Sequence, residues 1–261
     1  MNQNSSSHGV PERSNFVYLP REHLSSFARH DLKRYPVKKA AANGHSGVFK
    51  EIEGHHDRRD REAIEREIKA ERERTIKTGT KLFEKGVNAV KEGDFKKAFV
   101  FFTGCQLVCL ENPIYTLNRA AVSLELKVYK GVIIDTRMAL EKADAAAKHG
   151  PQAIEGFDRS KAYYISGQAL FHMGEWARAE RTLVVALLGK PGDPEIMNAI
   201  RTLHETARRC KCKEDHARWV AQQGEVDLDD LFAPGELEKA ADEASGMNRE
   251  ECLRRIRSLR Q

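Results

Sequence analysis

The 261-residue sequence lacks several features that would place it in large classes of proteins. No apolar run approaches the ~18 residues of a membrane-spanning helix, and the first fifteen residues lack the apolar stretch of a secretory signal. The five cysteines are an odd number without the spacing of a disulfide framework. These absences predict free thiols in a reducing compartment, with the cytoplasm as the expected location and the nucleus as the alternative.

Signatures of catalysis and metal binding are also missing. The sequence has no phosphate-binding glycine loop, no Gly-x-Ser-x-Gly turn and no His-Glu-x-x-His motif. Cys210 and Cys212 lie near His216, but structural zinc usually needs a second ligand pair at wider spacing, and the next cysteine is Cys252. We therefore expect plain thiols, no metal, no cofactor and no enzymatic activity.

Neither sign of charge dominates the composition. The chain has 44 Lys and Arg against 39 Asp and Glu, a net charge of +5, with 40% hydrophobic residues. Dedicated nucleic-acid binders usually concentrate their basic residues, so this balance favours a soluble protein with interspersed ion pairs. RNA binding through basic helices at the two ends is a lesser alternative, which a steep fall of affinity with salt would support.

The residue pattern changes along the chain. Residues 1–57 are rich in Ser, Asn, Gly, His and charge and contain three prolines, which predicts a disordered N-terminal tail. Residues 58–77 alternate Arg and Glu with opposite charges at i,i+4 spacing, which predicts a charged lead-in helix. From residue 78 to 210 the apolar spacing is strongly helical and it repeats.

The repeat has a period of 34 residues. Phe95 and Tyr129 are 34 residues apart, each beside a short break between two helical stretches, and Trp176 follows a break of the same shape. Such a period of helix–turn–helix units predicts a stacked α-helical array. Small residues such as Gly86 and Gly167 fall where the two helices of a unit would have to cross closely.

These units resemble the tetratricopeptide repeat (TPR) family. The family consensus has a small residue, a Gly-Asp-Tyr-like turn, alanines and a closing proline. The third unit, with Gly167, Gly174 and Pro191, matches nearly every position. The second has Lys127 instead of the turn glycine, but its Asn118-Arg119-Ala120-Ala121 is similar to a stretch common in co-chaperone TPR domains. The resemblance covers about half of the chain.

The resemblance implies an all-α fold, an α-solenoid of three TPR units with a capping helix over residues 194–210. The units are expected near residues 79–112, 113–148 and 158–191, with a loop between the second and third. Three helix starts carry side chains that can accept bonds from backbone N–H groups in the first turn. They are Asn112, Asp158 and Asp193.

TPR arrays of this type bind partners on a concave surface formed by the first helix of each unit. The family's carboxylate clamp holds the acidic tail of heat-shock chaperones, and this chain keeps two of its five residues. Three lost donors, each worth about 1.5–3 kcal/mol, disfavour that partner. The apolar replacements instead predict a partly apolar peptide or helix, unless they simply pack in the core. The predicted groove comprises Phe83, Val87, Leu117, Asn118, Lys161, Ile165, Gln168 and His172.

Residues 211–261 leave the repeat as a C-terminal extension. Residues 213–220 are predicted to extend the capping helix, with Trp219 against it. A following acidic-hydrophobic segment is a candidate docking motif for another protein or for the chain's own groove, with a short helix ending at Pro234 as the alternative. Its apolar members are Val226, Leu228, Leu231 and Phe232. A capping box at Asn248–Glu251 predicts a short basic helix.

The leading hypothesis is a non-catalytic adaptor that binds a protein partner in the TPR groove. The first alternative is a co-chaperone that binds a heat-shock chaperone tail through a degenerate clamp. The second is an RNA-associated helical-repeat protein.

Overall fold

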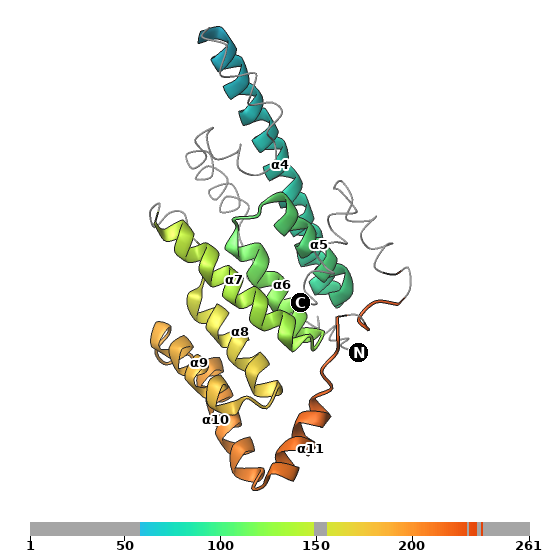
Figure 1. Cartoon of the computed structure of the whole chain (residues 1–261), viewed down its shortest axis with the longest axis vertical. Coiled ribbons are helices and arrows are strands. Elements are labelled where there is room, and N and C mark those ends of the chain that lie inside the picture. Colours follow the sequence, from blue (N-terminus) through green and yellow to red (C-terminus); the bar gives the residue numbers. More distant parts are fainter. Residues whose placement is uncertain (1–57, 149–155, 229, 234–235, 237–261) are drawn as a thin grey trace, which may run out of the picture.

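The structure is a computed structural model that describes residues 58–148, 156–228, 230–233 and 236 (Figure 1). The regular elements within these residues are α-helices that follow one another as antiparallel hairpins, which confirms the predicted all-α solenoid. The helices are α4 (Arg58–Glu92), α5 (Phe95–Val108), α6 (Pro113–Glu125), α7 (Tyr129–Ala147), α8 (Arg159–His172), α9 (Trp176–Gly189), α10 (Pro194–Arg209) and α11 (Lys213–Gln223).

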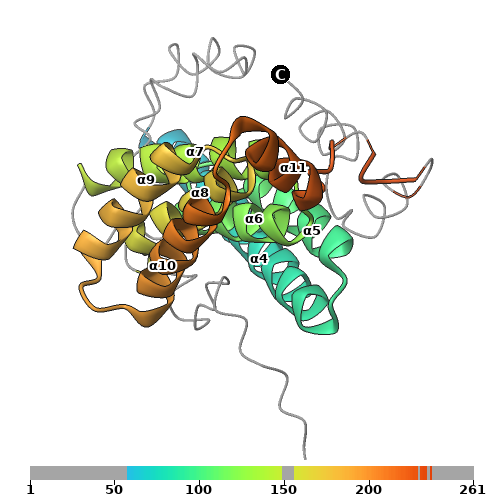
Figure 2. The same cartoon turned by 90° about the horizontal axis from the view of Figure 1, so that it is seen from below.

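The helices stack in chain order. Hairpin α4–α5 lies at one end, α9 and α10 lie at the other, and α6–α8 lie between them in both views (Figures 1 and 2). Each helix from α4 to α10 packs against the next, and α6, α8 and α10 also contact one another in sequence. A continuous core of buried apolar side chains therefore runs through all three hairpins.

Helix α4 is continuous over 35 residues. The charged lead-in segment and the first helix of the first hairpin are therefore one element, and the boundary expected near residue 77 lies inside it. The change in composition marks a change of environment, because the N-terminal part of α4 extends beyond the other helices (Figure 1). Gly79 does not break the helix, since an isolated glycine costs only about 1 kcal/mol there.

The three turns within the hairpins have the same backbone conformation. Gly93 and Gly174 have φ of +82° and +78°, and Lys127 has φ of +61° at the equivalent place. In each turn the following residue donates its N–H to the carbonyl five positions earlier, as in the bond from Val128 to Ser123 of 2.8 Å. The second hairpin thus has the TPR-like turn although its glycine is replaced by lysine.

Replacing Lys127 by glycine is expected to stabilise the protein by about 0.5–1 kcal/mol. Glycine relieves the strain of a side chain at positive φ, which costs about 1–2 kcal/mol. Its greater conformational freedom in the unfolded chain opposes this effect and lowers the stability by about 0.5–1 kcal/mol. Urea denaturation measures the difference. Lys127→Ala is the control, because it removes the side chain but keeps the Cβ; an equal effect of both substitutions would contradict the explanation.

The predicted N-caps are confirmed. The side chain of Asn112 accepts a bond of 2.9 Å from the N–H of Ile114, and that of Asp158 accepts one of 3.2 Å from Lys161. Asp193 accepts bonds from two N–H groups at the start of α10. These caps satisfy donors at helix N-termini, so they fix where α6, α8 and α10 begin.

A buried ion pair joins the two helices of the second hairpin. The guanidinium of Arg119 in α6 donates to both carboxylate oxygens of Asp135 in α7, with an Nε–Oδ2 distance of 2.9 Å. Both side chains are buried. The guanidinium also lies 5.8 Å from the ring centre of Phe99 in α5, which connects the pair to the first hairpin.

Helix α11 is separate from the capping helix, so the prediction that residues 213–220 extend that helix is wrong. Cys210 and Cys212 adopt extended backbone conformations, and the Cys212 thiol accepts the N–H of Asp215 to cap a new helix. The chain therefore reverses direction. Trp219 packs on Phe171 of the third hairpin, with a ring-centre distance of 4.9 Å.

Three predicted features lie outside the described residues. They are the disordered tail (1–57), most of the loop between the second and third units (149–155) and the basic helix opened by Asn248–Glu251. Within the described residues, no helix combines the length and the apolar character that crossing a membrane requires.

Candidate functional site

Half of the predicted groove residues belong to the core, and the groove prediction is corrected accordingly. The Phe83 ring lies 5.8 Å from that of Phe102 and 5.5 Å from that of Tyr115. The amide of Asn118 donates to the carbonyl of Ile114 in its own helix. The apolar stripe of the first helices packs against neighbouring helices, which is its usual use. The four buried residues are Phe83, Leu117, Asn118 and Ile165.

Three other predicted groove residues are half-buried: Val87, Lys161 and Gln168. Burial lowers the pKa of the Lys161 ammonium group. The Gln168 amide donates to the hydroxyl oxygen of Tyr164 over 2.8 Å, and burial raises the pKa of that hydroxyl to about 12. The first helices therefore present fewer contacts to a partner than the sequence predicts.

His172, the last predicted groove residue, binds α11. Its Nδ1 lies 2.8 Å from Oε1 of Gln223, while the amide nitrogen of Gln223 donates to the carbonyl of Trp219. Nδ1 of His172 is therefore the donor in the first bond. The imidazole stacks on the Tyr129 ring at 5.2 Å. Burial lowers the pKa of His172, and the positive charge of Lys127 also lowers it, against the opposing effect of the bond to Gln223.

The candidate docking motif lies on the chain itself, at the turn ends of the first two hairpins. We call residues 225–236 the strap; 229, 234 and 235 lie outside the described residues. The N–H of Val226 donates to the carbonyl of Lys127 over 3.1 Å. Leu228 and Leu231 are only 7% and 5% exposed. Residues 225–228 and 230–233 are irregular chain, turns and bends in place of the alternative short helix.

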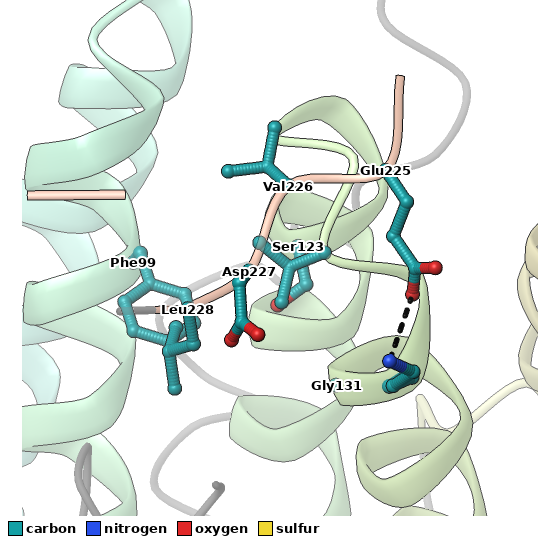
Figure 3. Close-up of a pocket in the computed structure, with 9 residues that line it drawn as sticks. Phe99, Ser123, Gly131, Glu225, Val226, Asp227 and Leu228 are labelled. Carbon is teal, nitrogen blue, oxygen red and sulfur yellow. Dashed lines mark ion pairs between the residues drawn. The ribbon is translucent and has the colours of Figure 1, made fainter. Parts of the chain in front are cut away.

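A cavity of about 300 Å³ separates part of the strap from the hairpins (Figure 3). Leu228 lies beside Phe99, and an ion pair joins Glu225 to Lys130 at 4.0 Å. The strap and the hairpins thus border a pocket that is partly open to solvent. The lining residues are Phe99, Ser123, Val128, Lys130, Gly131, Glu225, Val226, Asp227 and Leu228.

A second cavity, of about 280 Å³, opens between α7 and α9 with α8 beneath it. Each helix contributes one stripe of side chains at helical spacing, such as Ile133, Arg137 and Leu140 from α7. We call this surface the arginine groove. It is lined by Ile133, Thr136, Arg137, Leu140, Tyr163, Ser166, Leu170, Arg178, Arg181, Thr182 and Val185.

The charge of the arginine groove has one sign. Its lining includes three arginines and no carboxylate. Arg137 and Arg178 pair with Glu141 and Glu175 of their own helix or turn, which do not line the groove, and their side chains stay 71% and 55% exposed. Val185, among the apolar lining residues, is 43% exposed.

Sequence reasoning missed this groove because it examined only the first helix of each unit. The sequence pattern that could have indicated the groove lies on the second helices of the units. There Arg137, Arg178 and Arg181 alternate with apolar residues at helical spacing. That pattern alone is typical of any half-exposed helix face. The packing of α7 and α9 on α8 is what brings the two stripes to one surface.

The two cysteines and the histidine near residue 212 have structural contacts. His216 Nε2 lies 3.0 Å from the carbonyl oxygen of Gly174, and its ring is nearly perpendicular to that of Trp176, with ring centres 4.5 Å apart. Cys210 and Cys212 are free thiols at helix ends. Across the described part of the chain, no group of three or more His, Cys, Asp or Glu side chains is placed to hold a metal ion.

The fold of the chain is similar to that of a solved TPR domain. No protein-family model matches the sequence, and no curated protein matches it. The Arabidopsis OM64 TPR domain is 24% identical to this chain with a TM-score of 0.44, and the match covers 50% of this chain and 98% of that domain.

Proposed function

We propose that this chain is a non-catalytic adaptor that binds a partner protein in the arginine groove. The observation that carries the proposal is an open groove with an apolar lining, three arginines and no lining carboxylate. The partner segment is an amphipathic helix that places an apolar stripe between α7 and α9 and acidic residues beside the arginines. Helix-in-groove binding of this kind is a recurring mode of peptide recognition.

The energetics favour that class of partner. An apolar side chain that becomes buried gains about 1.5–3 kcal/mol, and the groove leaves Val185 partly exposed for such a contact. A guanidinium matches a carboxylate with two parallel bonds, which adds orientation to affinity. A basic partner would instead meet three like charges. The groove therefore selects acidic amphipathic helices over basic ones.

The concave first-helix face has less support as the binding surface. Four of its eight predicted contacts are buried in the core. The co-chaperone alternative relies on Asn118 and Lys161, and the amide of Asn118 already donates within α6. Because Asn118 is buried, a chaperone tail could reach its amide only if neighbouring side chains moved. The adaptor proposal accordingly rests on the outer groove.

Charge reversal in the groove is expected to abolish partner binding. The double variant Arg137→Glu/Arg181→Glu removes two charge-assisted contacts, each worth about 1.5–3 kcal/mol, and repels an acidic helix. Because 1.4 kcal/mol corresponds to about tenfold in affinity, captured partner should fall at least tenfold. The measurement is quantitative mass spectrometry after affinity capture from a cell lysate.

The matched control is Arg201→Glu/Arg209→Glu, two exposed residues of α10 that do not line the groove. It changes the net charge by the same amount. Proteins lost with the groove variant but kept with the control support the proposal. Identical protein profiles for the two variants, with both shown to be folded by circular dichroism, would rule the groove out as the binding surface.

A further inference from the structure

The strap lies on a basic surface that we call the turn edge, formed by Lys96, Phe99, Lys127, Val128 and Lys130. These residues lie at or just after the turns of the first and second hairpins. The strap follows Gly224, the left-handed C-cap of α11. It leaves the third hairpin and crosses to the other two, a path that Figure 1 shows beside the lower ends of α5 and α6.

The contacts of the strap are those that proteins use to hold an extended peptide. One main-chain bond, from Val226 N–H to the carbonyl of Lys127, fixes its position. Two leucines spaced three residues apart are buried, and the ring of Phe232 lies 6.2 Å from that of Phe99. A main-chain bond combined with pockets for alternate side chains is a general mode of peptide recognition.

The charges of the strap and the turn edge are complementary. Lys96 Nζ lies 3.0 and 3.2 Å from the two carboxylate oxygens of Glu236 and 5.9 Å from the centre of the Phe232 ring. Lys130 pairs with Glu225 at 4.0 Å. Both lysine side chains are at least 40% exposed. Exposed ion pairs contribute little to stability, so the docked state depends mainly on the apolar contacts.

A pocket that is partly open to solvent lies beside the strap, so the strap does not cover the whole turn edge. A space of about 300 Å³ lies between the strap and residues such as Phe99, Val128 and Gly131, and Val226 borders it. The space is partly open to solvent, so a ligand side chain could enter it without displacing the core. A ligand with a larger side chain at the position of Val226 would fit better.

We propose that the turn edge is a binding surface for acidic, leucine-containing segments of partner proteins, and that the strap occupies it in the resting state. The partner segment carries two leucines spaced three apart, an aromatic residue next to the second, and acidic residues on both sides. This surface is separate from the arginine groove and does not rest on the function proposed for it. Strap release is the step that opens the turn edge.

Tethering explains how the strap keeps the turn edge closed. A segment joined by a short linker acts at an effective concentration on the order of millimolar. A free peptide of the same sequence at micromolar concentration cannot displace it. Weakening the strap in the full-length chain therefore unmasks binding of a peptide that the wild-type chain excludes.

The test uses full-length protein and a fluorescent synthetic peptide with the sequence of residues 224–236. Leu228→Asp/Leu231→Asp releases the strap, and fluorescence anisotropy measures peptide binding. The variant is expected to bind at least tenfold more tightly than wild type. A folded variant that binds no more tightly than wild type overturns the proposal. Phe232→Ala/Glu236→Ala, which keeps both leucines, is the second variant if the first does not fold.

Two controls define the binding surface and the ligand class. Adding Lys96→Glu/Lys130→Glu to the released variant replaces two weak attractions by repulsions and should weaken peptide binding severalfold; unchanged affinity would show that the peptide binds elsewhere and overturns the proposal. A peptide with Val226→Leu should bind about fourfold more tightly, from one additional buried CH₂ group. A peptide in which glutamate replaces every aspartate should compete with the original peptide. Failure to compete would refute the proposal that the turn edge recognises acidic, leucine-containing segments in general.

Discussion

Asp135→Ala is expected to lower the free energy of unfolding by about 3–5 kcal/mol. The substitution leaves the guanidinium of Arg119 buried without its carboxylate partner, since both side chains lie in the core between α6 and α7. A charge isolated from water and from its counter-ion is among the most costly defects in a protein interior. Because domains are stable by only about 5–15 kcal/mol, urea denaturation should show a large shift of the midpoint.

A double substitution separates the cost of an orphaned charge from the loss of an interaction. Arg119→Met/Asp135→Leu replaces the pair by apolar side chains of similar size, which is often neutral or stabilising. We expect the double variant to be more stable than Asp135→Ala by at least about 2 kcal/mol. If the single and double variants unfold at the same urea concentration, the cost is not due to the buried charge.

Gly167→Val is expected to destabilise the third hairpin by about 3 kcal/mol. A Cβ at Gly167 would lie 2.7 Å from both Cγ and Cδ2 of Leu183, and 3.5 Å from its backbone nitrogen. The close atoms include the branch point of a buried leucine, which has little room to move. The two helices of the hairpin would have to separate, and overpacking of this kind outweighs any gain in helix propensity.

The control for this prediction places a valine at an exposed position of α9, where it adds two of the three side-chain carbons that Gly167→Val adds. Ala177→Val should cost only about 0.5 kcal/mol, the difference in helix propensity. Thermal unfolding followed by circular dichroism measures both variants. If Gly167→Val costs no more than Ala177→Val, the close approach of α8 and α9 is not tight enough to matter.

The positions of the helices could be predicted because the signals for them are local. The prolines that start α6 and α10 and the caps at Asn112, Asp158 and Asp193 act within one or two helical turns, and the period of 34 residues repeats such local signals along the chain. Even the turn with Lys127 was placed correctly, because the aromatic spacing compensates for the missing glycine. The helix boundaries therefore depend on residues that are close to them in the sequence.

The binding surfaces could not be predicted, because they depend on contacts between distant segments. The sequence shows an apolar stripe in the first helices, but not that Phe83 meets Phe102 and Tyr115. It shows acidic and apolar residues after Gly224, but not that Val226 bonds to Lys127, 99 positions earlier. The break between α10 and α11 was also missed, because nothing at Cys210–Cys212 resembles a proline or glycine stop.

The measurement that tests the proposed function most directly is site-specific photocrosslinking from α9. A photoreactive amino acid replaces either Val185, which lines the arginine groove, or Leu188, which does not. Leu188 is the more exposed of the two, at 75% against 43%, so chance collisions favour it. The adaptor proposal predicts crosslinks to a discrete partner from position 185 and not from position 188. Equal crosslinking at both positions, or crosslinking from position 188 alone, would contradict it.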